Sequence, residues 1–326
     1  MKAPYRWIYW RVEQTFCSPY LRPHIILAAH LGHFKLPDFI IIGSERGGTS
    51  SLYVYLTNEP RIVAALRKEI DFFDQKYQKG WTWYLGHFVV AFSNRAIGSK
   101  LDNYLASRTY EESFKKPLLS KIISRLRSLG YLPFGDTSNL LTGEASVSCL
   151  FFPEAAERVA KSLPNTRIIV LLRDPVERAY SHYQHELAMG YEYLSFEDAL
   201  RRECVIDGGK WRLRNLREKS MFEYVHFSYL AKGLYAEQLK CWMEKIPRDR
   251  FLILKSEDFF NDPSNSFAQV LQFLGLPRSN RIAFRKYNEG NYQPLDATLR
   301  DQLKEFYEPH NEELSRFLGL DLSDWC

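Results

Sequence analysis

The sequence predicts an α/β protein in which a central parallel sheet is flanked by helices. Three apolar runs rich in Ile, Leu and Val have the composition of strands buried on both faces, at 38–43, 167–175 and 250–259. Helical patterns lie between and after these runs. Because strands that alternate with helices form parallel sheets, we expect ligands to bind at the carboxyl ends of the strands.

Helices are expected where apolar residues recur at helical spacing. The expected helices cover residues 49–57, 154–162, 176–189, 196–202, 229–245, 263–274 and 297–318. Pro153, Pro175 and Pro263 stand where helices start and Gly275 stands where one stops, which are the positions that proline and glycine prefer.

The bulk composition indicates one globular domain with a large core. The 326 residues are 45% hydrophobic and 25% charged. We expect a single domain over residues 38–326 with a variable insertion at about 89–136, after an N-terminal extension, 1–37, that packs on the domain. The aromatic and basic segment 5–33 leaves peripheral contact with a membrane as an alternative. The net charge of +5 is too mild to indicate a partner, and no nucleic acid is expected.

The cysteines indicate reduced thiols in a cytoplasm. Cys17, Cys149, Cys204, Cys241 and Cys326 are scattered with no C-x-x-C pair, so no metal site is expected. No run approaches the about 20 apolar residues of a membrane span. We therefore expect a cytoplasmic protein; a Golgi location would require an anchor outside this sequence.

The strand expected at 38–43 leads into the turn GSERGG, followed by TSS, which is typical of a phosphate-binding loop. Glycines let the backbone approach an anion closely, and the first turn of the next helix adds unpaired N–H groups. Hydroxyls and a guanidinium complete such a site. The residues expected to contact the anion are Arg46, Gly47, Gly48, Thr49, Ser50 and Ser51.

This loop differs from that of ATP- and GTP-binding proteins. Their loop reads G-x-x-x-x-G-K-[ST], whereas here Gly48 directly precedes Thr49 and the cation is Arg46. We also find no clear acidic strand end to hold magnesium. A nucleotide kinase or NTPase is therefore the weaker alternative, and a ligand that needs no metal fits better.

A second anion site is predicted where the strand 167–175 ends. Arg173 stands at the strand end and Ser181 follows eight residues later, about two helical turns, so both can face one side. Asp174 is expected to cap the helix. Two anion sites on one sheet predict a nucleotide that is phosphorylated at two places.

Together these stretches resemble the sulfotransferase family that uses 3′-phosphoadenosine 5′-phosphosulfate (PAPS). GSERGGTSSL (43–52) is similar to its 5′-phosphosulfate loop, and RIIVLLRDPVERAYSHY (167–183) to its 3′-phosphate motif. KEIDFFD (68–74) resembles the segment with the catalytic glutamate in the heparan-sulfate-type branch. Further stretches similar to that branch and its soluble relatives, in the same order, are 143–151, 232–242 and 307–319. The resemblance implies a P-loop-like sulfotransferase fold, with PAPS as co-substrate and no metal.

The resemblance also implies catalytic roles. Glu69 would be the base that deprotonates the acceptor, and the neighbouring Phe72 and Phe73 would partly desolvate it and raise its pKa. Arg46 would stabilise the bridging oxygen of the leaving group, where the family usually has lysine. Because arginine does not readily give up a proton, acid assistance to the leaving group is in doubt.

Further cofactor contacts are implied near the C-terminus. RKYNEGNYQPL (285–295) resembles the family's last cofactor loop, with Lys286, Asn288 and Gly290 as candidates, although a surface turn explains this stretch equally well. Tyr235 is a candidate for the adenine pocket, with a core position as its alternative.

The acceptor is less well indicated. The resemblance implies a hydroxyl or amine acceptor, with a glycan among the candidates, and the basic stretch 95–127 is expected to border its cleft. Ala145 stands where several glycosaminoglycan enzymes carry lysine, and Asp71 where part of the family has histidine. Glycosaminoglycan specificity is therefore not transferred. A non-catalytic nucleotide- or glycan-binding relative is the remaining alternative, and no pattern indicates an oligomeric state.

Overall fold

The computed structural model describes residues 35–88, 140–208, 210–215, 219–279, 282, 284 and 292–325. Three sequence-based expectations lie outside these residues: the structure of the extension up to residue 34, the insertion at about 89–136, and the loop with Lys286, Asn288 and Gly290.

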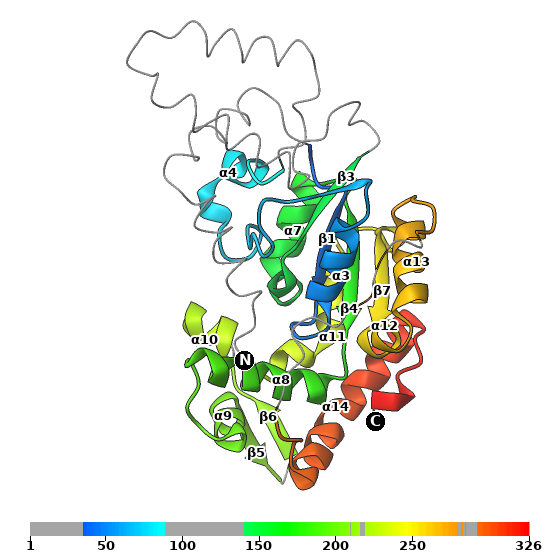
Figure 1. The fold of residues 1–326 in the computed structure, drawn as a ribbon. Coiled ribbons are helices and arrows are strands. Elements are labelled where there is room, and N and C mark those ends of the chain that lie inside the picture. The colour runs from blue at the N-terminus through cyan, green and yellow to red at the C-terminus, as the bar shows by residue number, and fades with distance from the viewer. Residues whose placement is uncertain are drawn as a thin grey trace, which may run out of the picture. The chain divides into compact units, whose positions relative to one another are not determined.

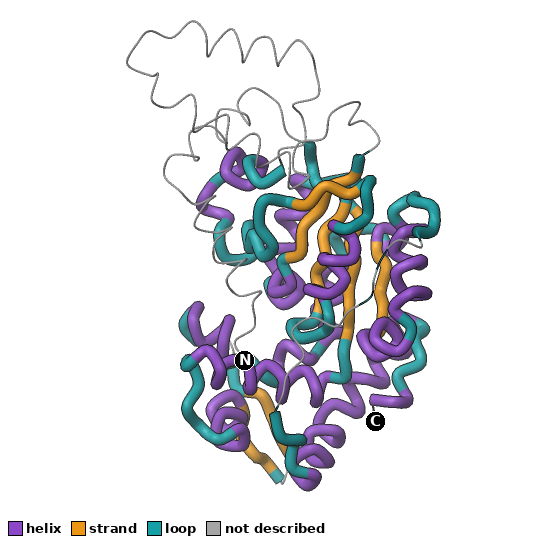
Figure 2. Tube along the Cα trace, viewed as in Figure 1, coloured by secondary structure: helices purple, strands orange, loops and turns teal. Residues whose placement is uncertain are grey.

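In the described residues the central sheet has five strands in the order β2-β3-β1-β4-β7, which confirms the predicted α/β class. The strands are β1 (Phe39–Gly43), β2 (Ile62–Ala64), β3 (Leu141–Ala145), β4 (Arg167–Leu172) and β7 (Phe251–Lys255). Strand β2 pairs parallel with β3, and β4 pairs parallel with β7 from Ile168 opposite Phe251 to Leu172 opposite Lys255. Apart from β2 and β3, neighbouring strands are not consecutive in the chain. Parallel neighbours need crossover connections, and helices lie between β4 and β7 in the chain (Figure 2).

The helices alternate with these strands (Figure 1). They are α3 (Thr49–Thr57), α4 (Trp81–Leu85), α7 (Pro153–Ser162), α8 (Pro175–Met189), α9 (Phe196–Glu203), α10 (Met221–His226), α11 (Tyr235–Met243), α12 (Ser256–Asn261), α13 (Pro263–Phe273) and α14 (Ala297–Leu318). Short 3₁₀ turns are η1 (Tyr77–Lys79), η3 (Val147–Phe151), η5 (Ala231–Gly233), η6 (Arg248–Arg250) and η7 (Ser323–Trp325). Strands β5 (Cys204–Asp207) and β6 (Lys210–Leu213) form a separate antiparallel hairpin.

The strand expected over 167–175 ends at Leu172, and two other expected elements differ more from their predicted bounds. The strand expected to reach residue 259 ends at Lys255, and α12 follows with Glu257 and Asp258 in its first turn, where acidic residues favour a helix start. The helix expected over 229–245 starts only at Tyr235. Before it, Gly233 packs so closely that a Cβ atom would lie 2.6 Å from the Tyr307 hydroxyl. The backbone leaves helical geometry at Leu234, with φ −81° and ψ +69°, and this separates the turn η5 from α11.

The chain divides into two compact units, which we describe separately. One unit comprises Met1–Ile40 and Leu56–Glu144, and its described core is aromatic: Phe72 stacks on Tyr84 with ring centroids 4.7 Å apart. The other comprises Ile41–Tyr55 and Ala145–Cys326. In this second unit α8 packs against α14 and η5, and α11 packs against α7 and α14 (Figure 1).

Candidate active site

The predicted phosphate loop connects β1 to α3 in the second unit. Its start is fixed to the sheet because the Ser44 N–H donates to the Leu171 carbonyl of β4 at 2.8 Å. Its tip is closed by the Gly47 N–H, which donates to the Ser44 carbonyl at 3.0 Å. The Ser256 hydroxyl at the start of α12 donates to the Gly47 carbonyl at 2.7 Å. The loop is therefore fixed by hydrogen bonds to two other elements.

Both loop glycines are required by the space around them. Gly48 has a φ of +91°, and a Cβ atom there would lie 2.7 Å from the Phe260 ring. A Cβ atom on Gly47 would lie 2.4 Å from the Ser44 hydroxyl. Side chains larger than hydrogen would therefore strain the turn that leads into α3.

Arg46 connects the two predicted anion sites. Its Nε donates to the Ser181 hydroxyl of α8 at 3.2 Å, and its own carbonyl accepts from Arg173 Nη1 at 3.0 Å. These three residues come from β1–α3 and β4–α8, two segments far apart in the sequence. The structure thus brings together the residues that sequence reasoning assigned to separate phosphates.

The hydroxyl residues of the loop lie in the first turn of α3, where amide groups lack helical acceptors. Thr49 and Ser51 are buried, and Ser50 is half-buried. The helix start at Thr49 agrees with the prediction.

Asp174 caps α8 as expected. Its carboxylate accepts from the Val176 and Glu177 amides at 2.8 and 3.2 Å. Burial raises the pKa of Asp174 to about 6, even though these amide hydrogen bonds lower it. The cap fixes the helix start directly after Arg173.

Arg173 has charged neighbours that sequence reasoning did not identify. Its Nη2 lies 3.8 Å from Glu177, and the same carboxylate pairs with Arg300 of α14. Arg300 therefore adds a second guanidinium near the predicted 3′-phosphate site. The sequence signal was an arginine in the first turns of the helix 297–318, which is not distinctive.

Tyr235 lies behind Arg173. Its hydroxyl donates to the Arg173 carbonyl at 2.9 Å, and its side chain is only 1% exposed. Burial raises the pKa of the Tyr235 hydroxyl to about 12, so the group stays protonated and can donate. In this structure Tyr235 supports the backbone of the second anion site.

The predicted base lies in the first unit, on a strained segment. Among the described residues other than glycine, those with a left-handed φ are Arg46 at 67°, Glu69 at 59° and Asp71 at 54°. Such backbone strain is concentrated at functional sites. Glu69 pairs with Lys68, and its side chain is 50% exposed, whereas Phe72 and Phe73 are buried in the aromatic core. The Glu69 side chain is thus partly buried, and the effect of the rings on its carboxylate stays a prediction.

Asp71 and Glu144 are further carboxylates of this unit. Burial raises the pKa of Asp71 to about 6, against the lowering effect of Lys76, which is 2.8 Å away. Glu144 is completely buried and accepts from the Tyr84 hydroxyl at 2.6 Å. Its contacts are those of a structural group in the core.

Sequence reasoning also missed a buried charge cluster beside the phosphate loop. Lys232 of η5 donates to Glu45 at 2.8 Å, although 187 positions separate them in the chain. His182 of α8 lies 3.4 Å from the other Glu45 oxygen. Neither Glu45 nor Lys232 belongs to a pattern that spacing alone would identify.

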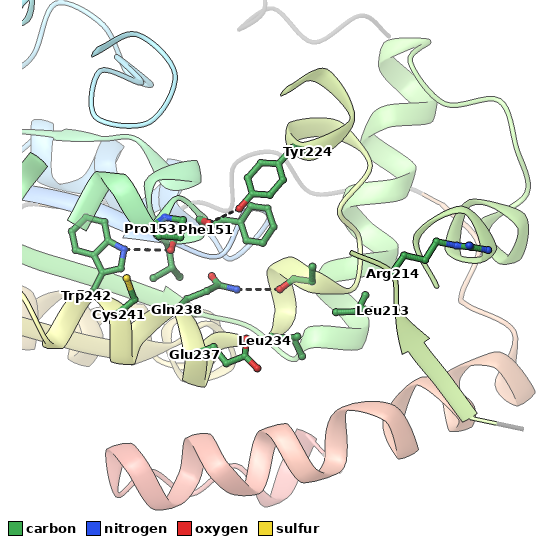
Figure 3. A pocket seen from close by; sticks show the side chains of 12 residues that line it. Phe151, Pro153, Leu213, Arg214, Tyr224, Leu234, Glu237, Gln238, Cys241 and Trp242 are labelled. Atoms are coloured by element: carbon green, nitrogen blue, oxygen red, sulfur yellow. Dashed lines mark hydrogen bonds between the residues drawn. The ribbon is translucent and has the colours of Figure 1, made fainter. Parts of the chain in front are cut away.

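A cavity of about 270 Å³ lies in the second unit between η3, α10 and α11 (Figure 3). Most of its polar side chains donate hydrogen bonds to backbone carbonyls. Tyr224 donates to the carbonyl of Phe151, Gln238 to that of Ala231 and Trp242 to that of Leu150. The remaining wall is mostly apolar, with Glu237 and Arg214 at exposed positions.

The part of the chain that the structure describes contains neither a metal-binding cluster nor a membrane-spanning helix. No group of three or more His, Cys, Asp or Glu side chains is placed to hold a metal ion there. In the same residues no helix combines the length and the apolar character needed to cross a membrane.

Comparison with known proteins identifies sulfotransferases. Residues 36–306 match the family model described as a sulfotransferase domain. A membrane-associated sulfotransferase, kil1, of Dictyostelium discoideum is 23% identical over 88% of this chain and 66% of its own length. The bifunctional heparan sulfate N-deacetylase/N-sulfotransferase 4 of Mus musculus is 28% identical over 89% of this chain and 31% of its own. The chain thus spans about a third to two thirds of these curated relatives.

A solved structure is also similar. The sulfotransferase from Alicyclobacillus acidocaldarius is 26% identical, with a TM-score of 0.59 over 89% of this chain and 99% of that one. This likeness extends over nearly the whole of that chain and supports the fold assignment.

Proposed function

This chain belongs to the sulfotransferase domain family, and on that premise we propose that it transfers a sulfuryl group from PAPS to a hydroxyl or amine. In this reaction the acceptor atom bonds to sulfur while the bond from sulfur to the bridging oxygen of PAPS breaks. The acceptor proton passes to a base, and adenosine 3′,5′-bisphosphate leaves.

The observation that carries this proposal is the junction of Arg46, Ser181 and Arg173. Hydrogen bonds of 3.2 and 3.0 Å hold these residues together at the carboxyl ends of β1 and β4. A donor with phosphate groups at both the 5′ and 3′ positions needs cationic and hydroxyl groups from two such sites. A nucleoside triphosphate, whose phosphates form one chain, does not need this arrangement.

We assign the 5′-phosphosulfate to the loop from Arg46 to Ser51 and the 3′-phosphate to Arg173 and Ser181. The first-turn amides of α3 and the Arg46 guanidinium would stabilise the charge that grows on the leaving phosphate. Arg300, beside Glu177, is a further candidate for the 3′ side. Lys286, Asn288 and Gly290 remain assigned to closing over the same phosphate.

We assign Glu69 as the base. Its half-exposed side chain is accessible to an acceptor, and the left-handed backbone at Glu69 indicates a constrained, functional position. Lys68, paired with it, would orient the carboxylate before the acceptor approaches.

For the acceptor we propose a carbohydrate hydroxyl or amine. The support is the similarity to the heparan sulfate N-deacetylase/N-sulfotransferase of Mus musculus, which covers 89% of this chain. The location is proposed to be cytoplasmic, in keeping with Cys149, Cys204 and Cys241, which are free cysteines in the structure.

Calorimetric titration with adenosine 3′,5′-bisphosphate tests the proposal. We expect saturable binding that is unchanged by EDTA, because the charge of the phosphates is met by side chains and amides. Absence of binding, or binding only with added magnesium, would contradict the proposal. ATP with magnesium is the matched ligand for the kinase alternative and is expected to bind more weakly.

A further inference from the structure

The phosphate loop carries a carboxylate at a place where a negative charge should oppose its function. Glu45 directly precedes Arg46, and its side chain is 20% exposed. An anion bound by the loop would be repelled by this carboxylate, because two like charges at short range in a partly buried site interact strongly. The structure shows how this charge is neutralised.

Lys232 and His182 bind the two oxygens of Glu45. Lys232 Nζ lies 2.8 Å from Oε1, and His182 Nε2 lies 3.4 Å from Oε2. The lysine side chain is only 5% exposed and also donates to the Val225 carbonyl. The ring of Phe151, which lines the cavity in Figure 3, lies 5.8 Å from its Nζ. A buried ammonium is costly unless it is paired, so Lys232 is committed to this contact.

His182 extends the cluster into α8. Its Nε2 also lies 3.3 Å from Glu186, whose other oxygen lies 2.9 Å from His226 Nδ1. Burial keeps the pKa of His182 well below its usual value, which favours the neutral ring. It contributes little compensating charge, and Lys232 is the cation that balances Glu45.

The same contacts fix the backbone beside Arg46. Glu45 is held from η5 and from α8, and the next residue has a φ of 67° with its Nε on Ser181. The Cα atoms of Glu45 and Arg46 are about 3.8 Å apart, so fixing one residue limits the movement of the other. The position of the Arg46 guanidinium therefore depends on the contacts of Glu45 with Lys232 and His182.

We propose that Lys232 is a positioning residue for the phosphate loop, which neutralises Glu45 and holds Arg46 toward the 5′-phosphate end of the donor. This inference rests on the proposed PAPS-binding function and adds a requirement to it. Its distinguishing feature is selectivity: losing Lys232 should impair binding of a 5′-phosphate and spare binding of a 3′-phosphate.

The test compares two nucleotides on matched variants by calorimetry. Lys232→Met removes the charge and keeps the apolar stem, and we expect adenosine 3′,5′-bisphosphate to bind about tenfold to a hundredfold more weakly. Binding of adenosine 3′-monophosphate should change by less than about twofold to threefold. Lys240→Met, which breaks the exposed Lys240–Glu313 pair, is the control and should leave both affinities unchanged.

A double variant tests the mechanism. Glu45→Gln/Lys232→Met removes both charges, so we expect it to bind the bisphosphate several-fold more tightly than Lys232→Met alone. Glu45→Gln alone, whose amide oxygen still accepts from Lys232, should stay within about threefold of the original protein. Should Lys232→Met not fold, Lys232→Gln takes its place, because it still donates to Glu45 without the charge.

The outcomes separate this inference from the proposed function. If the original protein does not bind the bisphosphate, the function is wrong and the positioning role is wrong with it. If the original protein binds and Lys232→Met weakens both nucleotides equally, or the double variant is no better than the single one, only the role of Lys232 is overturned.

Discussion

At the scale of single residues, Arg46, Glu69 and Asp71 share a backbone conformation that a side chain makes unfavourable by about 1–2 kcal/mol. All three lie in the two segments with catalytic assignments, the phosphate loop and KEIDFFD. Strain of this kind persists only where the surroundings fix it, and this supports functional roles for both segments.

We expect Glu69→Gln to lower sulfuryl transfer by about 10²–10⁴-fold, because the amide cannot accept the proton of the acceptor. Affinity for adenosine 3′,5′-bisphosphate should stay within a few-fold, since a base acts in turnover and hardly in cofactor binding. Steady-state kinetics on a confirmed acceptor, with calorimetry alongside, would measure both. Near-normal turnover would move the assignment of the base to Asp71.

Arg173→Ala should lower the affinity for adenosine 3′,5′-bisphosphate by about tenfold to a hundredfold, because a charge-assisted contact is lost. Because Arg173 also donates to the Arg46 carbonyl, the affinity for adenosine 5′-monophosphate should fall too, but by a smaller factor. Ser181→Ala removes a neutral donor, so it should lower the affinity for the bisphosphate less than Arg173→Ala does. Equal losses for the two nucleotides would show that Arg173 is structural.

Asp71 provides a pH-dependent test. Its pKa is raised from 3.8 to about 6 by burial, so the folded state holds the proton more tightly than the unfolded chain. Stability is therefore lost as pH rises from about 4 to 6, by about 3 kcal/mol for this shift. Asp71→Asn removes that loss. The melting temperature of the variant minus that of the original protein should therefore be larger at pH 7.5 than at pH 4.5.

Asp207→Asn, on the exposed β5–β6 hairpin, is the control for this measurement. Its difference from the original protein should be the same at both pH values. If the melting temperatures of the original protein and of Asp71→Asn change with pH in parallel, burial does not raise the pKa of Asp71.

At the scale of elements, proline and composition identified most helices but not every strand. Pro153, Pro175 and Pro263 mark the starts of α7, α8 and α13 as predicted. Strand β3 was missed because its five residues, LTGEA, include a buried glutamate and a glycine. That glycine, Gly143, is required since a Cβ atom would lie 2.5 Å from the Phe39 ring, a tertiary constraint with no sequence pattern.

The same limit applies to the candidate site. Proximity of Arg46, Arg173 and Ser181 could be predicted, because parallel strands end at one edge of the sheet. The contact of Glu45 with Lys232 could not, since it joins residues 187 positions apart and depends on how η5 packs. Packing of this kind is set by side-chain volume across the whole unit, which no local pattern encodes.

The turn from β1 to α3 can be tested through its glycine. Gly48→Ala combines a φ of +91° with a Cβ atom 2.7 Å from Phe260, so it should lower both melting temperature and nucleotide affinity. Gly80→Ala is the matched control, since Gly80 has a φ of +83° and no atom within 4 Å of a Cβ. A similar loss of stability in both variants would mean that the Phe260 contact relaxes without cost.

At the scale of the whole molecule, the candidate residues are distributed over two compact units. Arg46, Arg173 and Ser181 belong to Ile41–Tyr55 and Ala145–Cys326, and Glu69 belongs to the other unit. Nucleotide binding and proton abstraction are therefore assigned to different units. A ligand that binds only the first set should stabilise the unit that contains it.

Adenosine 3′,5′-bisphosphate at about 100 times its Kd should stabilise the folded state by about 2.7 kcal/mol. With unfolding entropy of about 2.1 cal/mol/K per residue, this predicts a rise in melting temperature of about 4 °C if all 326 residues unfold together. If the nucleotide-binding unit unfolds alone, the smaller entropy predicts about 6 °C in one of two transitions. Calorimetric scans with and without the bisphosphate distinguish the two cases, and no shift in any transition would contradict the assigned site. Adenosine, which lacks both phosphates, is the control and should leave each transition in place.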